Sequence, residues 1–258
     1  MIYINNKDKI KRLKRIDDYC VILDFDRTIT TKESDSSLGV LPNYIGGEFL
    51  ETRTKIHDYY RPKELDYSIS TEEKQKLMKE WAFKSFELLT KHITEKDIDK
   101  ATDKCNMHLR PGAKEFLSKM NDKKIPVIIL SGGMGNVIES FLKKQEVLFD
   151  NTVIVSNFIE FINNKPRIDY NNIISTSNKT YLVIPEETRK VLYNKDKILL
   201  FGDIVEDIKM VSKDHLEKTI TIGFLDQKIK QNLEIYNKNY DIVLTDSSGF
   251  NMIEVEVI

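Results

Sequence analysis

The chain has 258 residues, 40% of them hydrophobic, which suffices for one large domain or for a core domain that carries a smaller insertion. Its 40 basic and 41 acidic residues leave a formal net charge of -1, which gives no reason to expect a nucleic acid as partner. The 2 cysteines are too few for a disulfide framework, and the sequence has neither a signal-peptide core nor an apolar run long enough to cross a bilayer.

The first predicted strand covers residues 20–23, a short apolar run that ends at Asp24-Phe25-Asp26. Carboxylates separated by one residue point to the same side of an extended backbone, so Asp24 and Asp26 can reach one bound group. In phosphoryl transfer, one carboxylate can attack phosphorus while the other protonates the leaving oxygen and then activates water. Aspartates at strand ends also serve only to cap a turn or a helix, so this motif alone leaves both interpretations open.

The next segment contains no buried strand, only polar, helix-biased sequence. Ser70 and Glu73 are spaced as a capping box, which predicts the start of a helix. Apolar side chains at roughly helical spacing give this helix one face, formed by Leu77, Trp81, Phe86 and Leu89. We expect residues 31–110 to form a helical cap inserted into a core of residues 1–30 and 111–258, where a cap can close over a site and exclude water.

The second core strand is predicted at residues 126–130 and is followed at once by Ser131, Gly132 and a further glycine. A helix is predicted to begin soon after, over residues 136–144. A hydroxyl and glycine amides at a helix N-terminus form a site for a phosphoryl oxygen. A simple helix cap with a flexible turn is the alternative. The position of this segment at a strand end, like that of Asp24, favours the phosphate site.

A third strand is predicted at residues 152–155, and Asn163-Asn164 between apolar runs suggests an appended hairpin. Lys179 follows in a polar stretch. A lysine that reaches the site would pair with the transferred phosphoryl group and offset its developing charge. Because most of the chain's basic residues are expected at the solvated surface, spacing alone favours a surface position for Lys179.

The fourth strand is predicted at residues 197–201, with Asp203 at its end and Asp207 one helical turn later. Both side chains could face Asp24 and Asp26. Four clustered carboxylates would repel one another and a phosphate dianion, unless they took up protons or held a cation. Magnesium binds through carboxylates, waters and a substrate phosphate, so we expect Mg²⁺ at this cluster. A simple helix start at Asp203 and Asp207 is the alternative.

Further strands are predicted at residues 219–222 and 241–244, and a further helix at residues 112–120. Strands that read as continuous apolar runs and alternate with amphipathic helices are typical of an α/β fold. We therefore predict a Rossmann-like, doubly wound parallel sheet that carries the helical cap. In such sheets the ligand site lies beyond the carboxyl ends of the strands, which is where all the acidic and Ser-Gly segments fall.

The order of these segments resembles the motifs of the haloacid dehalogenase superfamily. The resemblance implies that Asp24 is the nucleophile and Asp26 the general acid and base. The ligands of phosphate and magnesium that it implies are Ser131, Lys179, Asp203 and Asp207.

The amino-acid sequence at several further positions resembles the cytosolic pyrimidine 5'-nucleotidase type III family, over nearly the whole chain after about residue 15. These positions are 59–60, 72–74, 80–81, 125–127, 155–158, 178–179 and 240–244. The resemblance implies that the cap reads the nucleotide base, that Glu64 contacts the substrate and that Trp81 lies near the base. From the residues alone, Trp81 at helical spacing is more often part of the cap's own core.

We therefore expect a cytoplasmic, magnesium-dependent phosphatase that hydrolyses a nucleoside 5'-monophosphate, a pyrimidine nucleotide such as CMP or UMP. The partner is a small-molecule nucleotide, without nucleic acid or membrane; the sequence does not fix the oligomeric state, and we favour a monomer. One alternative is a phosphatase for another small phosphomonoester, such as phosphoserine or 7-methylguanosine 5'-monophosphate (m7GMP). Another is a phospho-acceptor switch domain, for which Asp26 and a large cap would be superfluous.

Overall fold

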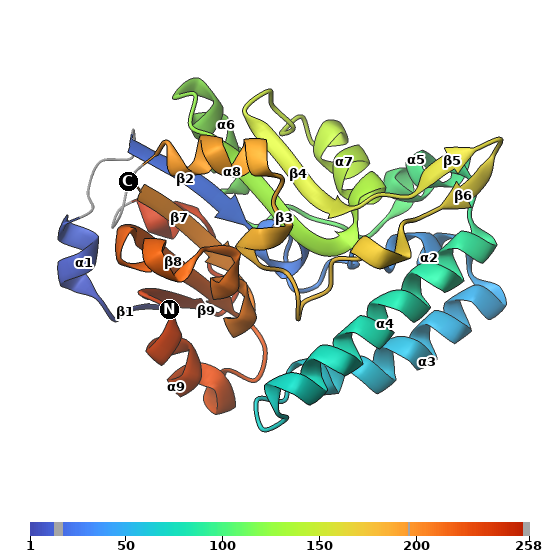
Figure 1. Ribbon diagram of the computed structural model, residues 1–258, viewed down its shortest axis with the longest axis horizontal. Helices are drawn as coiled ribbons and strands as arrows, with labels where there is room; N and C mark the ends of the chain where they lie inside the picture. The colour runs from blue at the N-terminus through green and yellow to red at the C-terminus, as the bar shows by residue number, and fades with distance from the viewer. Residues whose placement is uncertain (13–17, 196, 255–258) are drawn as a thin grey trace.

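The computed structural model describes residues 1–12, 18–195 and 197–254, and its centre is a seven-stranded sheet in the order β1-β9-β8-β7-β2-β3-β4 (Figure 1). Every neighbouring pair is parallel except the edge strand β1, which runs antiparallel to β9. The strands are β1 (Ile2–Ile4), β2 (Tyr19–Leu23), β3 (Val127–Met134), β4 (Thr152–Asn157), β7 (Lys197–Gly202), β8 (Thr219–Leu225) and β9 (Ile242–Thr245). The predicted α/β class and each predicted core strand are confirmed.

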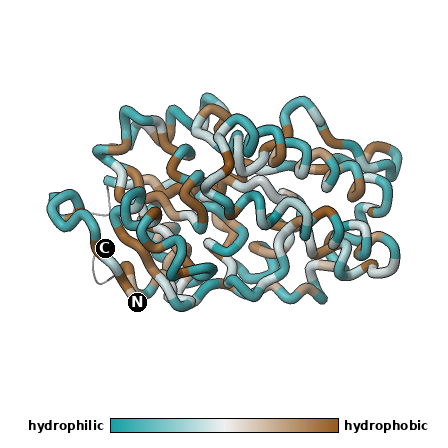
Figure 2. Tube along the Cα trace, turned by 90° about the horizontal axis from the view of Figure 1, so that it is seen from below, coloured by the Kyte–Doolittle hydropathy of each residue, from teal (hydrophilic) through white to brown (hydrophobic). Residues whose placement is uncertain are grey.

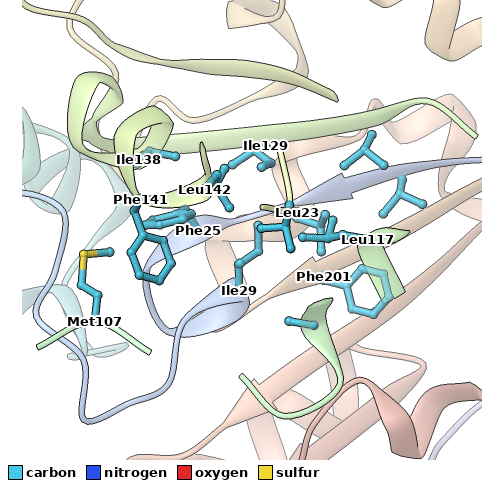
Figure 3. Packing of buried hydrophobic residues seen from close by; sticks show 14 of the residues in the cluster. Leu23, Phe25, Ile29, Met107, Leu117, Ile129, Ile138, Phe141, Leu142 and Phe201 are labelled. Atoms are coloured by element: carbon cyan, nitrogen blue, oxygen red, sulfur yellow. The ribbon is translucent and has the colours of Figure 1, made fainter. Parts of the chain in front are cut away.

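Side chains of successive strand residues pack on opposite faces of the sheet, because side chains alternate along a strand. On one face Leu23 packs in a cluster with Leu117 and Phe141, and Figure 3 shows this layer from close by. On the other face Ile22 belongs to a cluster with Leu192. The helices that cover the two faces are α6 (Ala113–Asp122) and α7 (Gly135–Lys144) on the first, and α8 (Glu186–Tyr193) and α9 (Ile229–Asn239) on the second.

The segment between β2 and α6 is helical. It holds α2 (Val40–Ile45), α3 (Gly47–Glu64), α4 (Thr71–His92) and α5 (Glu95–Lys104). The long helices α3 and α4 lie side by side as a hairpin to one side of the sheet (Figure 1). Helix α5 is fixed to α7 of the sheet layer, since Ser140 donates to Asp99 at 2.8 Å and Lys144 pairs with Asp103 at 2.7 Å.

Two details of α4 differ from the prediction. Ser70 caps the helix and accepts a hydrogen bond from the Glu73 N–H at 3.3 Å, which is one half of the predicted capping box. The stripe that packs inward is rotated relative to the predicted one, because the neighbouring α3 covers another side of the helix. Leu77 and Trp81 are half-buried, while the buried apolar side chains are Met78, Ala82, Phe86 and Leu89.

The predicted hairpin is confirmed as β5 (Glu160–Ile162) and β6 (Lys165–Arg167). Asn163 and Asn164 join them with φ of 52° and 60°, the left-handed pair that two-residue hairpin turns require. The other α-helices of the described residues are α1 (Lys7–Arg12) and α10 (Asn251–Glu254).

Short hydrophobic and hydrophilic stretches alternate along the trace in Figure 2, as expected when one face of each helix packs inward. Within the described ranges of the chain, no helix combines the length and the apolar character that a membrane span needs.

Candidate active site

The sheet order places β7, β2 and β3 next to one another, so the segments that follow these strands meet at one edge. Asp24 follows β2, Ser131 lies in the last part of β3, and Asp203 follows β7. All of them line one cavity, together with Asp26 and Lys179. The structure therefore brings together the side chains that the sequence placed at separate strand ends.

Asp24, Asp203 and Asp207 form an acidic group in which carboxylate oxygens lie within 4.8 Å of one another. Burial, and then the charges of Asp24 and Asp207, raise the pKa of Asp203 well above its usual value. Burial likewise raises the pKa of Asp207 to about 7, although Lys179 opposes the shift. Crowded carboxylates with an all-oxygen donor set suit a hard cation such as Mg²⁺.

Lys179 lies between two members of this acidic group, Asp24 and Asp207, with only 2% of the residue exposed. Its Nζ is 2.5 Å from Asp24 Oδ1 and 2.6 Å from Asp207 Oδ1. Burial disfavours the charged form, but the carboxylates of Asp207 and Asp24 outweigh burial and raise the pKa of Lys179. The lysine that spacing alone assigned to the surface is therefore a buried cation beside Asp24.

The orientation of Asp207 depends on a glycine. Asp207 Oδ2 accepts the backbone N–H of Asp203 at 3.0 Å and that of Ile204 at 3.2 Å. A Cβ on Gly202 would lie 2.3 Å from the same oxygen. Gly202 thus leaves the space in which Asp207 is held one turn beyond the strand end.

The carboxylate of Asp26 is bound by Ser37 and lies outside the acidic group defined above. The Ser37 N–H donates to Asp26 Oδ1 at 2.8 Å, and the Ser37 hydroxyl donates to Oδ2 at 2.7 Å. Burial and the charge of Asp24 raise the pKa of Asp26, against the opposing effect of the Ser37 bonds. The group of three carboxylates does not include Asp26, and its predicted role as a metal ligand stays a prediction. Ser37 gave no signal in the sequence, since it lies in an ordinary polar stretch.

A buried asparagine ties the phosphate-site segment to the segment that leads to Lys179. Asn157, at the end of β4, donates to the carbonyl of Gly132 at 2.9 Å and to that of Ile174 at 2.8 Å. It also accepts the Ile174 N–H at 2.8 Å. Ser131 is 1% exposed, and its hydroxyl accepts the N–H of Gly133 at 3.1 Å. In the sequence, the motif around Asn157 indicated only the family. The structure gives it a role, because Asn157 holds the two segments together.

Helices α3 and α4 form the opposite wall of the cavity, where both predicted cap residues lie. Glu64 is buried and forms an ion pair with Arg61. Trp81 is half-buried and stacks on Tyr60 with the ring centroids 6.0 Å apart and the planes 9° from parallel. Besides Lys179, the cavity is lined by basic residues that the sequence did not single out, which are Arg27, Arg53, His57 and Arg61.

A family model described as "Pyrimidine 5'-nucleotidase (UMPH-1)" matches residues 23–257. A 7-methylguanosine phosphate-specific 5'-nucleotidase A from Xenopus laevis is 31% identical over 251 residues, which cover 92% of this chain and 87% of the relative. A crystal structure of cytosolic 5'-nucleotidase IIIB bound to cytidine matches with a TM-score of 0.81 and 25% identity, covering 99% of this chain and 92% of that one. A haloacid dehalogenase family hydrolase from Salmonella enterica serovar Typhi shares the fold at a TM-score of 0.64 and 16% identity, over 96% of this chain and 73% of that one.

Proposed function

Because the chain belongs to the pyrimidine 5'-nucleotidase (UMPH-1) family of phosphoric monoester hydrolases, we propose that it hydrolyses a nucleoside 5'-monophosphate to a nucleoside and inorganic phosphate. The observation that carries this proposal is the buried ammonium group of Lys179, 2.5 Å from the carboxylate of Asp24. A fixed cation beside a carboxylate at a strand end is suited to hold a phosphoryl group against that carboxylate.

In this proposal Asp24 attacks phosphorus and forms an aspartyl phosphate. Lys179, Ser131 and the backbone amides near Gly132 bind the phosphoryl oxygens. Asp26 donates a proton to the departing 5'-oxygen and then takes a proton from the water that hydrolyses the aspartyl phosphate. Its raised pKa, caused by burial and by the charge of Asp24, favours the protonated form that the first step needs.

Mg²⁺ fits the acidic group of Asp24, Asp203 and Asp207, and when bound it would supply positive charge against the phosphate oxygens. The carboxylate of Asp26 is hydrogen-bonded to Ser37, and in this proposal it carries out the proton transfers. We propose in addition that residues 31–110 act as the cap over this site. This is supported by the position of Glu64 and Trp81 in the cavity wall opposite Asp24.

For the base, we propose 7-methylguanine rather than the pyrimidine expected from the sequence. The name of the Xenopus relative favours this choice. A 7-methylguanine ring carries positive charge, and the half-buried indole of Trp81 can attract such a ring. Glu64 lies in the same cavity wall, where its carboxylate is paired with Arg61. The second candidate is a pyrimidine nucleotide such as CMP, which is favoured by the cytidine in the solved relative.

The test is phosphate release from m7GMP, GMP, CMP and UMP, with Mg²⁺ and with a chelator. GMP is the matched control, because it lacks only the methyl group and its charge. We expect kcat/KM for m7GMP to exceed that for GMP at least about tenfold, and to fall toward it in a Trp81→Leu variant. Equal rates for m7GMP and GMP would reject the choice of base, and no release from any of the four with Mg²⁺ would reject the nucleotidase.

A further inference from the structure

Lys74, near the start of α4, carries a charge that is buried away from solvent, with 7% of the residue exposed. Lysines are rarely buried unless their charge is paired. Its Nζ donates to the carboxylate of Glu206 at 3.0 Å and to the backbone carbonyl of Glu64 at 2.9 Å. The ring of Tyr67 also contacts this charge, with its centroid 4.6 Å from Nζ. One ammonium group therefore joins the start of α4, the end of α3 and a turn of the core.

Both hydrogen-bond partners of Lys74 border the candidate active site. Glu64 is the last residue of α3 and lines the cavity. Glu206 directly precedes Asp207, a member of the acidic group, and only 14% of the Glu206 side chain is exposed. The contacts of Lys74 therefore connect the cavity wall formed by the helical hairpin with the turn that carries Asp207.

The core side of this connection is held without Lys74. Asp207 accepts the backbone N–H groups of Asp203 and Ile204, as described above. The hydroxyls of Tyr236 and Tyr240, both buried, donate to the carbonyls of the same two residues. Since four hydrogen bonds fix this turn within the core, the helical hairpin is the part whose position depends on Lys74.

We propose that Lys74 is a positioning residue, which sets the distance between the wall that receives the nucleoside and the site that binds its phosphate. This inference rests on the proposed function and adds to it a residue that determines nucleotide affinity. Lys74 itself lies outside the lining of the cavity, so it acts through Glu64 and Glu206. A displacement of about 1 Å in such a wall can cost a large factor in turnover or affinity.

Lys74→Met tests this role, because it removes the charge and keeps an unbranched side chain. KM for a nucleoside 5'-monophosphate should rise at least about tenfold, with a smaller change in kcat. The inhibition constant of orthophosphate, which has neither base nor sugar, should stay the same. Lys76→Met is the matched control: Lys76 lies on the same helix in an exposed pair with Glu72 at 3.1 Å, and its loss should leave KM unchanged.

A double variant separates positioning from stability. Lys74→Met leaves the carboxylate of Glu206 buried without its partner, so its thermal unfolding temperature should fall. Lys74→Met/Glu206→Gln removes this unpaired charge, and its unfolding temperature should recover toward that of the wild type. Its KM should remain as high as that of the single variant. A double variant whose KM recovers together with its unfolding temperature would overturn the inference, because the pair would then contribute only stability.

Amide hydrogen exchange of residues 61–74, followed by mass spectrometry, tests the connection without any substrate. Exchange should be faster in Lys74→Met/Glu206→Gln than in the wild type and in Lys76→Met. Unchanged exchange would overturn the inference. An equal weakening of nucleotide and orthophosphate binding would also overturn it, because Lys74 would then act on the phosphate site. A wild type that releases no phosphate from any nucleoside monophosphate would instead overturn the proposed function, and hydrogen exchange would still test the connection.

Discussion

Gly133 lies where a side chain would collide with the group that holds Asp26. A Cβ at this position would be 1.9 Å from Ser37 Oγ and 3.2 Å from Asp26 Oδ2. Since Ser37 and Asp26 share two hydrogen bonds, the close approach of the glycine backbone is needed for their geometry.

We predict that Gly133→Ala displaces Ser37 and lowers kcat about a hundredfold, the usual scale for disturbing a general acid or base. Phosphate release under saturating substrate measures this loss. Ser37→Ala removes the hydroxyl bond without adding bulk and should also lower kcat, by a smaller factor. A Gly133→Ala enzyme with the wild-type kcat would show that the Ser37–Asp26 bonds are irrelevant to turnover.

The sequence reveals individual site residues only where local pattern carries them. Asp24, Ser131 and Asp203 stand at the ends of apolar runs, so their positions at one sheet edge follow from the fold class. Ser37 could not be assigned in this way, because its importance comes from Asp26, a partner that only folding brings close. The buried position of Lys179 has the same origin.

At the level of elements, β4 contributes to the site through its last residue, although it carries no acidic side chain into the cavity. Asn157 links the end of β3 to the segment before Lys179 through Gly132 and Ile174. The phosphate ligands of two different segments therefore share one support.

We predict that Asn157→Ala raises KM and lowers kcat, because both segments lose their common anchor. Unsatisfied buried groups at Gly132 and Ile174 should also cost about 1–3 kcal/mol in the free energy of unfolding, measured by denaturant titration. Asn151→Ala is the matched control: Asn151 donates to the carbonyl of Ile125 at 2.6 Å, just before the other end of β4. It should lose stability but keep its KM. The idea fails if the kinetic constants of the two variants change alike.

Elements were predictable where they were long and strongly patterned. Every predicted core strand is present. The edge strand β1 was not predicted, because it has only 3 residues and its pairing with β9 joins the two ends of the chain. The helical character of the segment after β2 was visible, whereas the packing of α5 on α7 was not. The inward stripe of α4 was misplaced because helical spacing alone does not tell which side a neighbouring helix covers.

For the whole molecule, the fold class follows from alternating strands and helices, and the family follows from the order of the site segments. The base does not. The family resemblance led us to expect a pyrimidine, whereas the name of the Xenopus relative favours 7-methylguanine. A few side chains on α3 and α4 would distinguish these two bases. Such contacts depend on how the helical hairpin of α3 and α4 faces the sheet, which no local sequence pattern encodes.

The proposed mechanism requires that Asp24 receives the phosphoryl group. The most direct measurement is single turnover of a nucleotide with Mg²⁺, quenched in acid, followed by mass spectrometry of the peptides. We predict that the peptide containing Asp24 gains the mass of one phosphoryl group, and that this gain is absent with a chelator or in Asp24→Asn. Turnover that leaves Asp24 unmodified at every quench time, or that continues in Asp24→Asn, would contradict the account.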